Sequence, residues 1–145
     1  MKLSTKGEYG LRAIIDIAEN SKNGEYVSIS DISTRQKISD RYLEKIIAKL
    51  KKSGLVKSSR GVNGGYILGK DPKCINMFDI LSVLEDNIDV TECMDIHVFE
   101  KCNNHYTCKA RKLWVKINEA VENVLKNTTL LDMIKQEIKK GEEIE

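Results

Sequence analysis

Residues 39–69 read SDRYLEKIIAKLKKSGLVKSSRGVNGGYILG, and this stretch decides the fold. In its first half, apolar residues recur at steps of three and four, and a serine precedes them. This pattern predicts a helix over Asp40–Ser53 that is capped by Ser39. The second half predicts two short strands, Leu55–Ser59 and Gly65–Leu68, joined by a turn that contains Asn-Gly.

Two further helices are predicted before this stretch. Apolar residues recur on one face of Thr5–Ser21, and the pattern breaks at Asn23-Gly24. A shorter helix then follows over Asp31–Gln36, with Ser30 as its cap. A short helix, a turn, a longer basic helix and a glycine-rich hairpin, in this order, predict a winged helix-turn-helix whose hairpin is the wing.

The rest of the chain is also predicted to be mainly helical. We expect a helix over Asn76–Asp86, no regular structure over Asn87–Thr107, and a long helix from Cys108 onward. The apolar seam of the long helix has near-heptad spacing, which is typical of dimerisation through a partner helix. A last helix over Leu130–Lys140, capped by Thr128 or Thr129, and a frayed tail over 142–145 complete the prediction.

The predicted fold class is therefore mainly α: a winged helix-turn-helix with a small two-stranded wing and a long C-terminal dimerisation helix. The chain divides into a DNA-binding domain over 1–86, a cysteine-bearing loop over 87–107, and a dimerisation helix with a C-terminal helix over 108–145.

Charge is unevenly distributed along the 145 residues. The net charge is only +2, but the segment from Arg35 to Lys73 holds eleven Lys and Arg residues against three Asp and Glu residues. That segment carries +8, so the remainder carries −6. A basic block in an otherwise acidic chain indicates a local site for a polyanion, although a solvated lysine-rich face gives the same count.

Composition also indicates where the protein works. No stretch approaches the roughly 18–20 apolar residues that span a bilayer, and residues 1–11 contain charge and glycine where a signal peptide needs an apolar run. We expect no membrane association and a cytoplasmic location. Cysteines there stay reduced and serve more often as ligands or sensors than as disulfides.

The helix over Asp40–Ser53 is expected to lie in the major groove of double-stranded DNA. Its exposed candidates for reading base edges are Arg41, Glu44 and Lys45. Arginine and lysine suit guanine, and glutamate can accept a hydrogen bond from the cytosine amino group.

The predicted wing supplies a second set of contacts. Arg60 is placed to enter the minor groove, and Ser59 and Asn63 can donate to phosphates. Glycines such as Gly64 let the backbone approach the DNA closely.

Three of the four cysteines, Cys93, Cys102 and Cys108, are separated by eight and five residues. Without a Cys-x2-Cys pair, a zinc finger or ribbon is disfavoured, but soft thiolates still favour an iron–sulfur cluster, zinc or copper(I). A fourth ligand could come from Glu8, His97, His105 or another thiolate. Cys74, beside a proline, is expected to be a packed free thiol.

These motifs resemble the IscR-like (Rrf2) transcription regulators. The resemblance covers about 135 residues, and its most specific parts are the wing sequence Arg60–Tyr66 and the cysteine segment that ends in Cys108–Trp114. It implies a homodimer that is joined through the long helix and binds palindromic promoter sites. Such a protein regulates transcription, for example as a repressor. It also implies a [2Fe–2S] cluster, or a [4Fe–4S] cluster as the alternative, on Cys93, Cys102 and Cys108.

Two departures from the family pattern concern the cluster. The first cysteine gap, eight residues here, is longer than in the best-known members. Arg111 stands where the cluster-assembly regulators have a histidine ligand, and a charged guanidinium cannot ligate iron. Regulators of the family that sense nitric oxide or redox state use an acidic residue of the partner's first helix, and Glu8 stands at that place. His105 is the less favoured fourth ligand.

The predicted function is a DNA-binding regulator, not an enzyme, that senses iron–sulfur, redox or nitric oxide status. One alternative keeps the winged helix but gives the cysteines thiol–disulfide or zinc sensing. Another class, an iron–sulfur electron carrier, leaves the basic helix and wing unexplained. No nucleophile–base pair, phosphate loop or paired carboxylates indicate catalysis.

Overall fold

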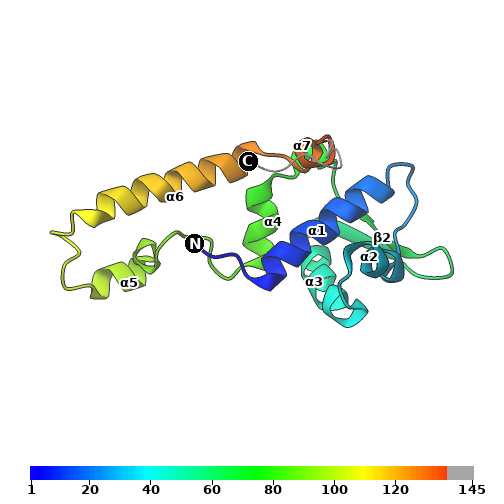
Figure 1. Cartoon of the computed structure of the whole chain (residues 1–145), viewed down its shortest axis with the longest axis horizontal. Helices are drawn as coiled ribbons and strands as arrows, with labels where there is room; N and C mark the ends of the chain where they lie inside the picture. The colour runs from blue at the N-terminus through cyan, green and yellow to red at the C-terminus, as the bar shows by residue number, and fades with distance from the viewer. Residues whose placement is uncertain (137–145) are drawn as a thin grey trace.

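The computed structural model describes residues 1–136. Two short strands and seven α-helices are found in that range, and Figure 1 shows their arrangement. The helices and strands are α1 (Thr5–Asn20), α2 (Ile29–Gln36), α3 (Asp40–Lys52), β1 (Val56–Ser59), β2 (Gly65–Leu68), α4 (Met77–Leu84), α5 (Ile96–Lys101), α6 (Ala110–Asn127) and α7 (Leu130–Ile134). Single 3-10 turns cover Pro72–Cys74 and Glu92–Met94.

The first three helices, the hairpin and α4 surround one apolar core, which confirms the predicted winged helix-turn-helix. Each helix contributes the residues of one face, as the three- and four-residue spacing requires. The largest fully buried side chains are Ile14, Ile17, Ile32, Leu43, Ile46, Ile47, Leu50, Ile75, Ile80, Leu84, Leu130 and Val56.

The wing is anchored to the segment before α2. Strands β1 and β2 pair antiparallel, with Val56 opposite Leu68 and Ser59 opposite Gly65. Tyr66 also exchanges two backbone hydrogen bonds of 2.8 Å with Val27. The hairpin therefore pairs on its second side as well, which holds the wing at a fixed angle to α2.

The long helix α6 projects away from the winged-helix part, and the segment that contains α5 lies beside its far end (Figure 1). Its near end is fixed by α7, which Thr129 and Asp132 cap reciprocally. Leu130 is fully buried and donates a 2.7 Å backbone hydrogen bond to Ile75, and Met77 donates to Thr128 at 2.9 Å. The C-terminal elements thus return to the DNA-binding core.

Several predicted boundaries need correction. Helix α2 begins at Ile29 with Ser28 as its cap, because the Ser28 hydroxyl, and not that of Ser30, accepts from the backbone of Asp31. The helix predicted to reach Asp86 ends at Leu84, where Glu85 turns extended and its carboxylate binds Ser4.

Further corrections concern the second half of the chain. The segment predicted to lack regular structure contains the short helix α5, and α6 starts at Ala110, two residues after Cys108. Helix α7 ends at Ile134. The predicted continuation to Lys140 runs into residues 137–145, which lie outside the described range, as does the predicted frayed tail.

Close packing of α1 on α4 requires glycine at position 10. A Cβ atom there would lie 2.4 Å from a methyl carbon of Leu84 and 3.1 Å from Ile46. Both neighbours are buried, so they have little room to move away.

We expect Gly10→Ala to lower the free energy of unfolding by up to about 2 kcal/mol, since overpacking costs about 1–3 kcal/mol and the helix-propensity gain of about 1 kcal/mol offsets only part of that cost. Urea denaturation measures this. Combining Gly10→Ala with Leu84→Ala should cost less than the sum of the two single variants, because the second change removes the clash. Strict additivity would contradict the packing argument.

Candidate DNA interface and cysteine segment

A short turn sets the angle between α2 and α3. Helix α2 ends in Lys37, whose left-handed backbone (φ 56°) directs its N–H to the carbonyl of Ser33 at 2.8 Å. The Ser33 hydroxyl then donates to the carbonyl of Ile38 at 2.7 Å. Ser39 follows as the cap of α3. The turn is therefore closed by its own hydrogen bonds, and α3 leaves it in a defined direction.

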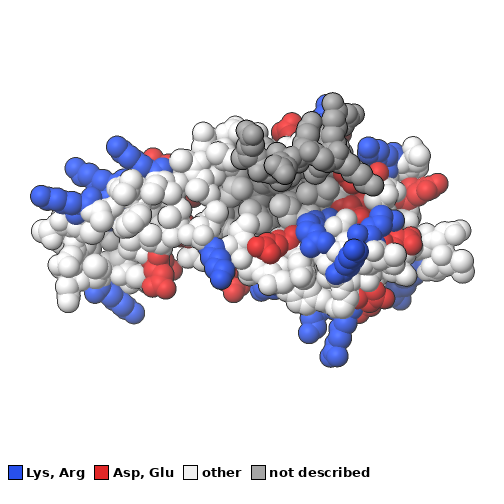
Figure 2. All heavy atoms as spheres, viewed as in Figure 1, with Lys and Arg blue, Asp and Glu red and all other residues white. Residues whose placement is uncertain are grey.

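The candidate base-reading residues Arg41, Glu44 and Lys45 all lie on the exposed side of α3. Their spacing of three and four residues places them on one face of the helix. The opposite face is buried in the core through Leu43, Ile46, Ile47 and Leu50, as the sequence predicted. Figure 2 shows positive side chains projecting beneath this part of the molecule.

A second pair of cations extends this surface. The Lys6 side chain of α1 is close to that of Lys49 in α3, and this neighbouring cation lowers the pKa of Lys49. Asp86 offsets the repulsion in part. Two adjacent ammonium groups are relieved by a nearby anion, such as a phosphate. The pair is consistent with a surface for a polyanion, and the sequence alone did not place these two residues together.

The tip of the wing is a tight turn. Gly61 has a φ of 107°, and its carbonyl accepts from the N–H of Gly64 at 3.0 Å. A Cβ atom at position 64 would lie 2.4 Å from the carbonyl oxygen of Ser59. Because its N–H is used within the turn, Gly64 can offer DNA only a close approach of the backbone. The side chains of Arg60 and Asn63 are exposed beside it.

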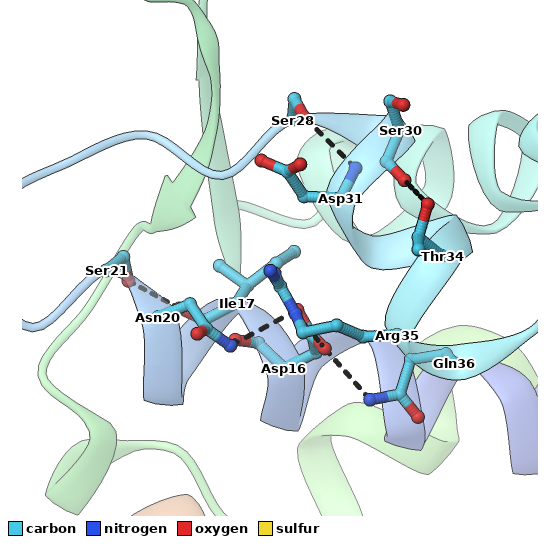
Figure 3. Close-up of polar contacts among 10 residues, drawn as sticks. All are labelled: Asp16, Ile17, Asn20, Ser21, Ser28, Ser30, Asp31, Thr34, Arg35 and Gln36. Carbon is cyan, nitrogen blue, oxygen red and sulfur yellow. Dashed lines mark hydrogen bonds and ion pairs between the residues drawn. The ribbon is translucent and has the colours of Figure 1, made fainter.

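A buried carboxylate joins α1 to the end of α2 (Figure 3). Asp16 is only 1% exposed, and it accepts from Nε and Nη2 of Arg35 at 3.0 and 2.7 Å and from Nε2 of Gln36 at 2.9 Å. The hydrogen bond to Asp16 raises the pKa of Arg35 above its already high usual value. Arg35 therefore holds α2 in place, and its charge is not free for DNA.

The three clustered cysteines are accessible thiols. Cys93 is half-buried beside the hydroxyl of Thr91, at 2.9 Å, while Cys102 and Cys108 are exposed at the end of α5 and just before α6. All the cysteines are free of disulfides. Cys74 is exposed as well, so the prediction of a packed thiol there is wrong.

The donor types suit an iron–sulfur cluster, since thiolates are its usual protein ligands. Within residues 1–136, however, no three Cys, His, Asp or Glu side chains are gathered around one point. Glu8 is exposed in the first turn of α1, on a different element from the cysteines. The described part of one chain thus supplies the ligand types without assembling them.

Aromatic and cationic side chains organise the cysteine segment. The ring of Phe99 lies 5.1 Å from that of His105, and the guanidinium of Arg111 lies 4.2 Å above Phe99. The imidazole Nδ1 of His105 contacts the carbonyl of Cys102 at 2.5 Å. This ring nitrogen is therefore engaged by the backbone, while Arg111 connects α5 to the start of α6.

A shallow apolar groove runs along α6. It has almost no polar surface, and it is lined by Met1, Ile117, Ala120, Val121, Val124 and Leu125. Val124 is 65% exposed and Leu113 is 53% exposed.

Among the described residues, no helix is long and apolar enough to cross a membrane.

The base of the cysteine segment is attached to α6 and to the N-terminus. The N–H of Val90 donates to the side-chain oxygen of Asn118 at 2.9 Å, and Asn118 donates to Asp89 at 3.3 Å. The ammonium group of Met1 donates to the carbonyl of Val90 at 3.0 Å.

A closed helix-turn-helix with an exposed basic face and a glycine-tipped wing defines a DNA-binding transcription regulator. Comparison with known proteins identifies the family of transcription regulators. The family model described as "Iron-dependent Transcriptional regulator" (Rrf2) matches residues 3–136, and the chain belongs to this family. Its relatives are named as transcription regulators, a class that is not enzymatic.

Individual relatives cover nearly the whole chain. The HTH-type transcriptional regulator IscR of Yersinia pseudotuberculosis is 37% identical over 92% of this chain and 79% of its own length. The structure of CymR (YrzC), the global cysteine regulator of B. subtilis, is 39% identical with a TM-score of 0.77 and covers 92% of this chain and 96% of that one. The structure of T. potens IscR is 38% identical with a TM-score of 0.73, and the match covers 93% of this chain and 87% of that one.

The Asp16 network gives a stability prediction. Arg35→Met should lower the free energy of unfolding by about 2 kcal/mol, because it leaves a buried carboxylate without its charged partner. The value lies below the ~3–5 kcal/mol for a fully buried pair, since the Arg35 side chain is 40% exposed. The control Glu122→Gln breaks an exposed pair with Lys126 and should cost under about 0.5 kcal/mol. Equal losses in chemical denaturation would contradict this account.

Proposed function

We propose that this regulator binds palindromic promoter sites as a homodimer and senses iron–sulfur, redox or nitric oxide status through a cluster on Cys93, Cys102 and Cys108. The observation that carries the sensing role is the placement of three free thiols on one segment of sixteen residues directly before α6. The matched family is described as iron-dependent, and IscR proteins are among the relatives, which supports iron as the metal.

The proposed DNA contacts are Arg41, Glu44 and Lys45 in the major groove and Ser59, Arg60, Asn63 and Gly64 at the wing. The exposure of the α3 face and the wing tip supports them. In this proposal residues 1–86 form the DNA-binding domain and residues 87–107 form the cysteine-bearing segment. Residues 108–145 form the dimerisation helix and the C-terminal helix.

The proposed dimer forms along α6. Its apolar side is partly open to solvent in the groove that Val121 and Val124 line, where Val124 is 65% exposed. A second copy of the same helix would remove this surface from water, which is the main driving force for helix pairing. Two copies of α3 related by a two-fold axis then match a palindromic site.

A bound cluster would supply a group whose electron count and integrity respond to oxidants and nitric oxide. We favour a [2Fe–2S] cluster, with [4Fe–4S] as the alternative. The fourth ligand would be Glu8 of the partner copy, because Arg111 occupies the place of a ligand histidine. His105 is the second choice, since one of its ring nitrogens already contacts the Cys102 carbonyl.

A second candidate function is thiol sensing without a cluster. Exposure of the Cys102 and Cys108 thiols favours it, as does the similarity to CymR, named as a global cysteine regulator. Iron and acid-labile sulfide assays with absorbance and EPR spectra, on protein purified without oxygen, separate the two. Iron and sulfide near two or four per chain support the cluster, and a colourless protein that resists reconstitution supports thiol chemistry.

We expect Cys102→Ala to remove the visible charge-transfer bands and to change promoter affinity without unfolding the protein, because the side chain of this cysteine is exposed. Absorbance, circular dichroism and a DNA-binding titration measure the three effects. Cys74→Ala is the matched control, since it removes an exposed thiol outside the segment and should change none of them. Wild-type promoter binding by Cys102→Ala, with and without oxygen, would overturn the sensor model.

Arg60→Ala should weaken DNA binding and reduce its salt dependence. Each phosphate contact that is lost lowers the slope of log K against log salt by about 0.9. Titrations at several salt concentrations give the slope. Lys73→Ala is the control, because Lys73 belongs to the same basic block but pairs with Asp71 at 3.8 Å. A slope unchanged in Arg60→Ala would remove this residue from the phosphate contacts.

A further inference from the structure

The wing tip carries an apolar side chain that the fold does not use. Val62 is fully exposed, more so than any other large apolar residue among positions 1–136, where Tyr106 follows at 90%. It lies between Arg60 and Asn63, whose side chains are exposed as well. Folding therefore removes none of its surface from water, and its presence adds no stability through the hydrophobic effect.

The turn itself does not explain this valine. Residues 61–64 form a turn closed by the hydrogen bond from Gly64 to Gly61, and Val62 and Asn63 are its two central residues. Neither has a positive φ, so neither position demands glycine. Glycine, proline, asparagine, aspartate and serine are favoured in such turns, and a β-branched residue gains nothing there. The turn therefore gives no structural reason for a valine at this position.

We propose that Val62 is a specificity residue that reads the floor of the DNA minor groove and selects A·T pairs over G·C pairs. This inference rests on the proposed entry of the wing into that groove. The 2-amino group of guanine projects from the floor of the minor groove, whereas an A·T pair presents only acceptors there. A branched methyl pair pressed against the floor fits an A·T pair and collides with the guanine amino group.

The surroundings of Val62 favour DNA over an apolar protein partner. A protein-docking surface needs a contiguous apolar patch, and at the tip Val62 is accompanied by glycine, asparagine and arginine. Proteins that bind the minor groove, by contrast, frequently combine arginine and asparagine side chains with an apolar side chain. Arg60 would bind the backbone or the groove wall, and Val62 would add the steric choice between base pairs.

Substitution with inosine tests whether the guanine 2-amino group is the feature that Val62 rejects. An inosine·cytosine pair has the major-groove groups of G·C but lacks the 2-amino group, so it resembles A·T in the minor groove. Duplexes that the wild-type protein selects from a random-sequence pool are the probes. Each A·T pair beside the recognition-helix half-site is replaced in turn by G·C and by I·C, and affinities are measured by fluorescence anisotropy.

For wild type, we expect at least one position where G·C weakens binding by about fivefold and I·C does not. Val62→Ala, with its methyl groups removed, should bind G·C and A·T equally there. Val62→Thr keeps the branched shape and should keep the discrimination. Because Val62 contacts no core residue, both variants should melt like wild type.

Two results overturn the proposal, and they are distinguishable. If Arg60→Ala weakens binding but no position separates G·C from I·C, or Val62→Ala still separates them, the wing contacts DNA and Val62 does not read it. If Arg60→Ala also leaves affinity and salt dependence unchanged, the placement of the wing in the groove fails and the reading by Val62 fails with it.

Discussion

The buried carboxylate of Asp16 is the constraint on which the DNA-binding geometry depends. A charge that is 1% exposed is tolerated only when it is well hydrogen-bonded, and two of its three side-chain partners, Arg35 and Gln36, are the last two residues of α2. The turn that follows is closed by its own hydrogen bonds. The direction of α3 is thus fixed relative to α1 by polar contacts of defined geometry, in addition to apolar packing.

The sequence predicted the winged helix because its local signals agree with one another. The apolar spacing of α3, the Ser39 cap and the Asn-Gly turn each act over a few residues, and all of them describe the same motif. The pairing of Asp16 with Arg35 and that of Val27 with Tyr66 join residues 19 and 39 positions apart. No spacing rule reveals such contacts, so the charge count of the basic block includes Arg35 although its guanidinium is paired with Asp16.

The DNA-binding face could be predicted from the sequence better than the cysteine segment, because only the face depends on local spacing. A helix periodicity says which side of α3 is exposed, and Arg41, Glu44 and Lys45 lie on that side. The cysteine segment has no periodicity, and its shape depends on contacts such as Arg111 on Phe99. The short helix α5 and the separate placement of the three thiols therefore could not be derived from spacing alone.

Contiguous contacts connect the cysteine segment to the DNA-binding face. The ammonium group of Met1 binds the carbonyl of Val90. Ser4, three residues after Met1, caps α1 and donates a hydrogen bond to Glu85, which follows the end of α4. Gly7 permits this approach, since a Cβ there would overlap the Glu85 carboxylate. Helix α1 in turn holds α2 through Asp16. The base of the cysteine segment is thus joined by contiguous contacts to the helix that orients α3, so the proposed sensor and the DNA-binding face share one structural element, α1.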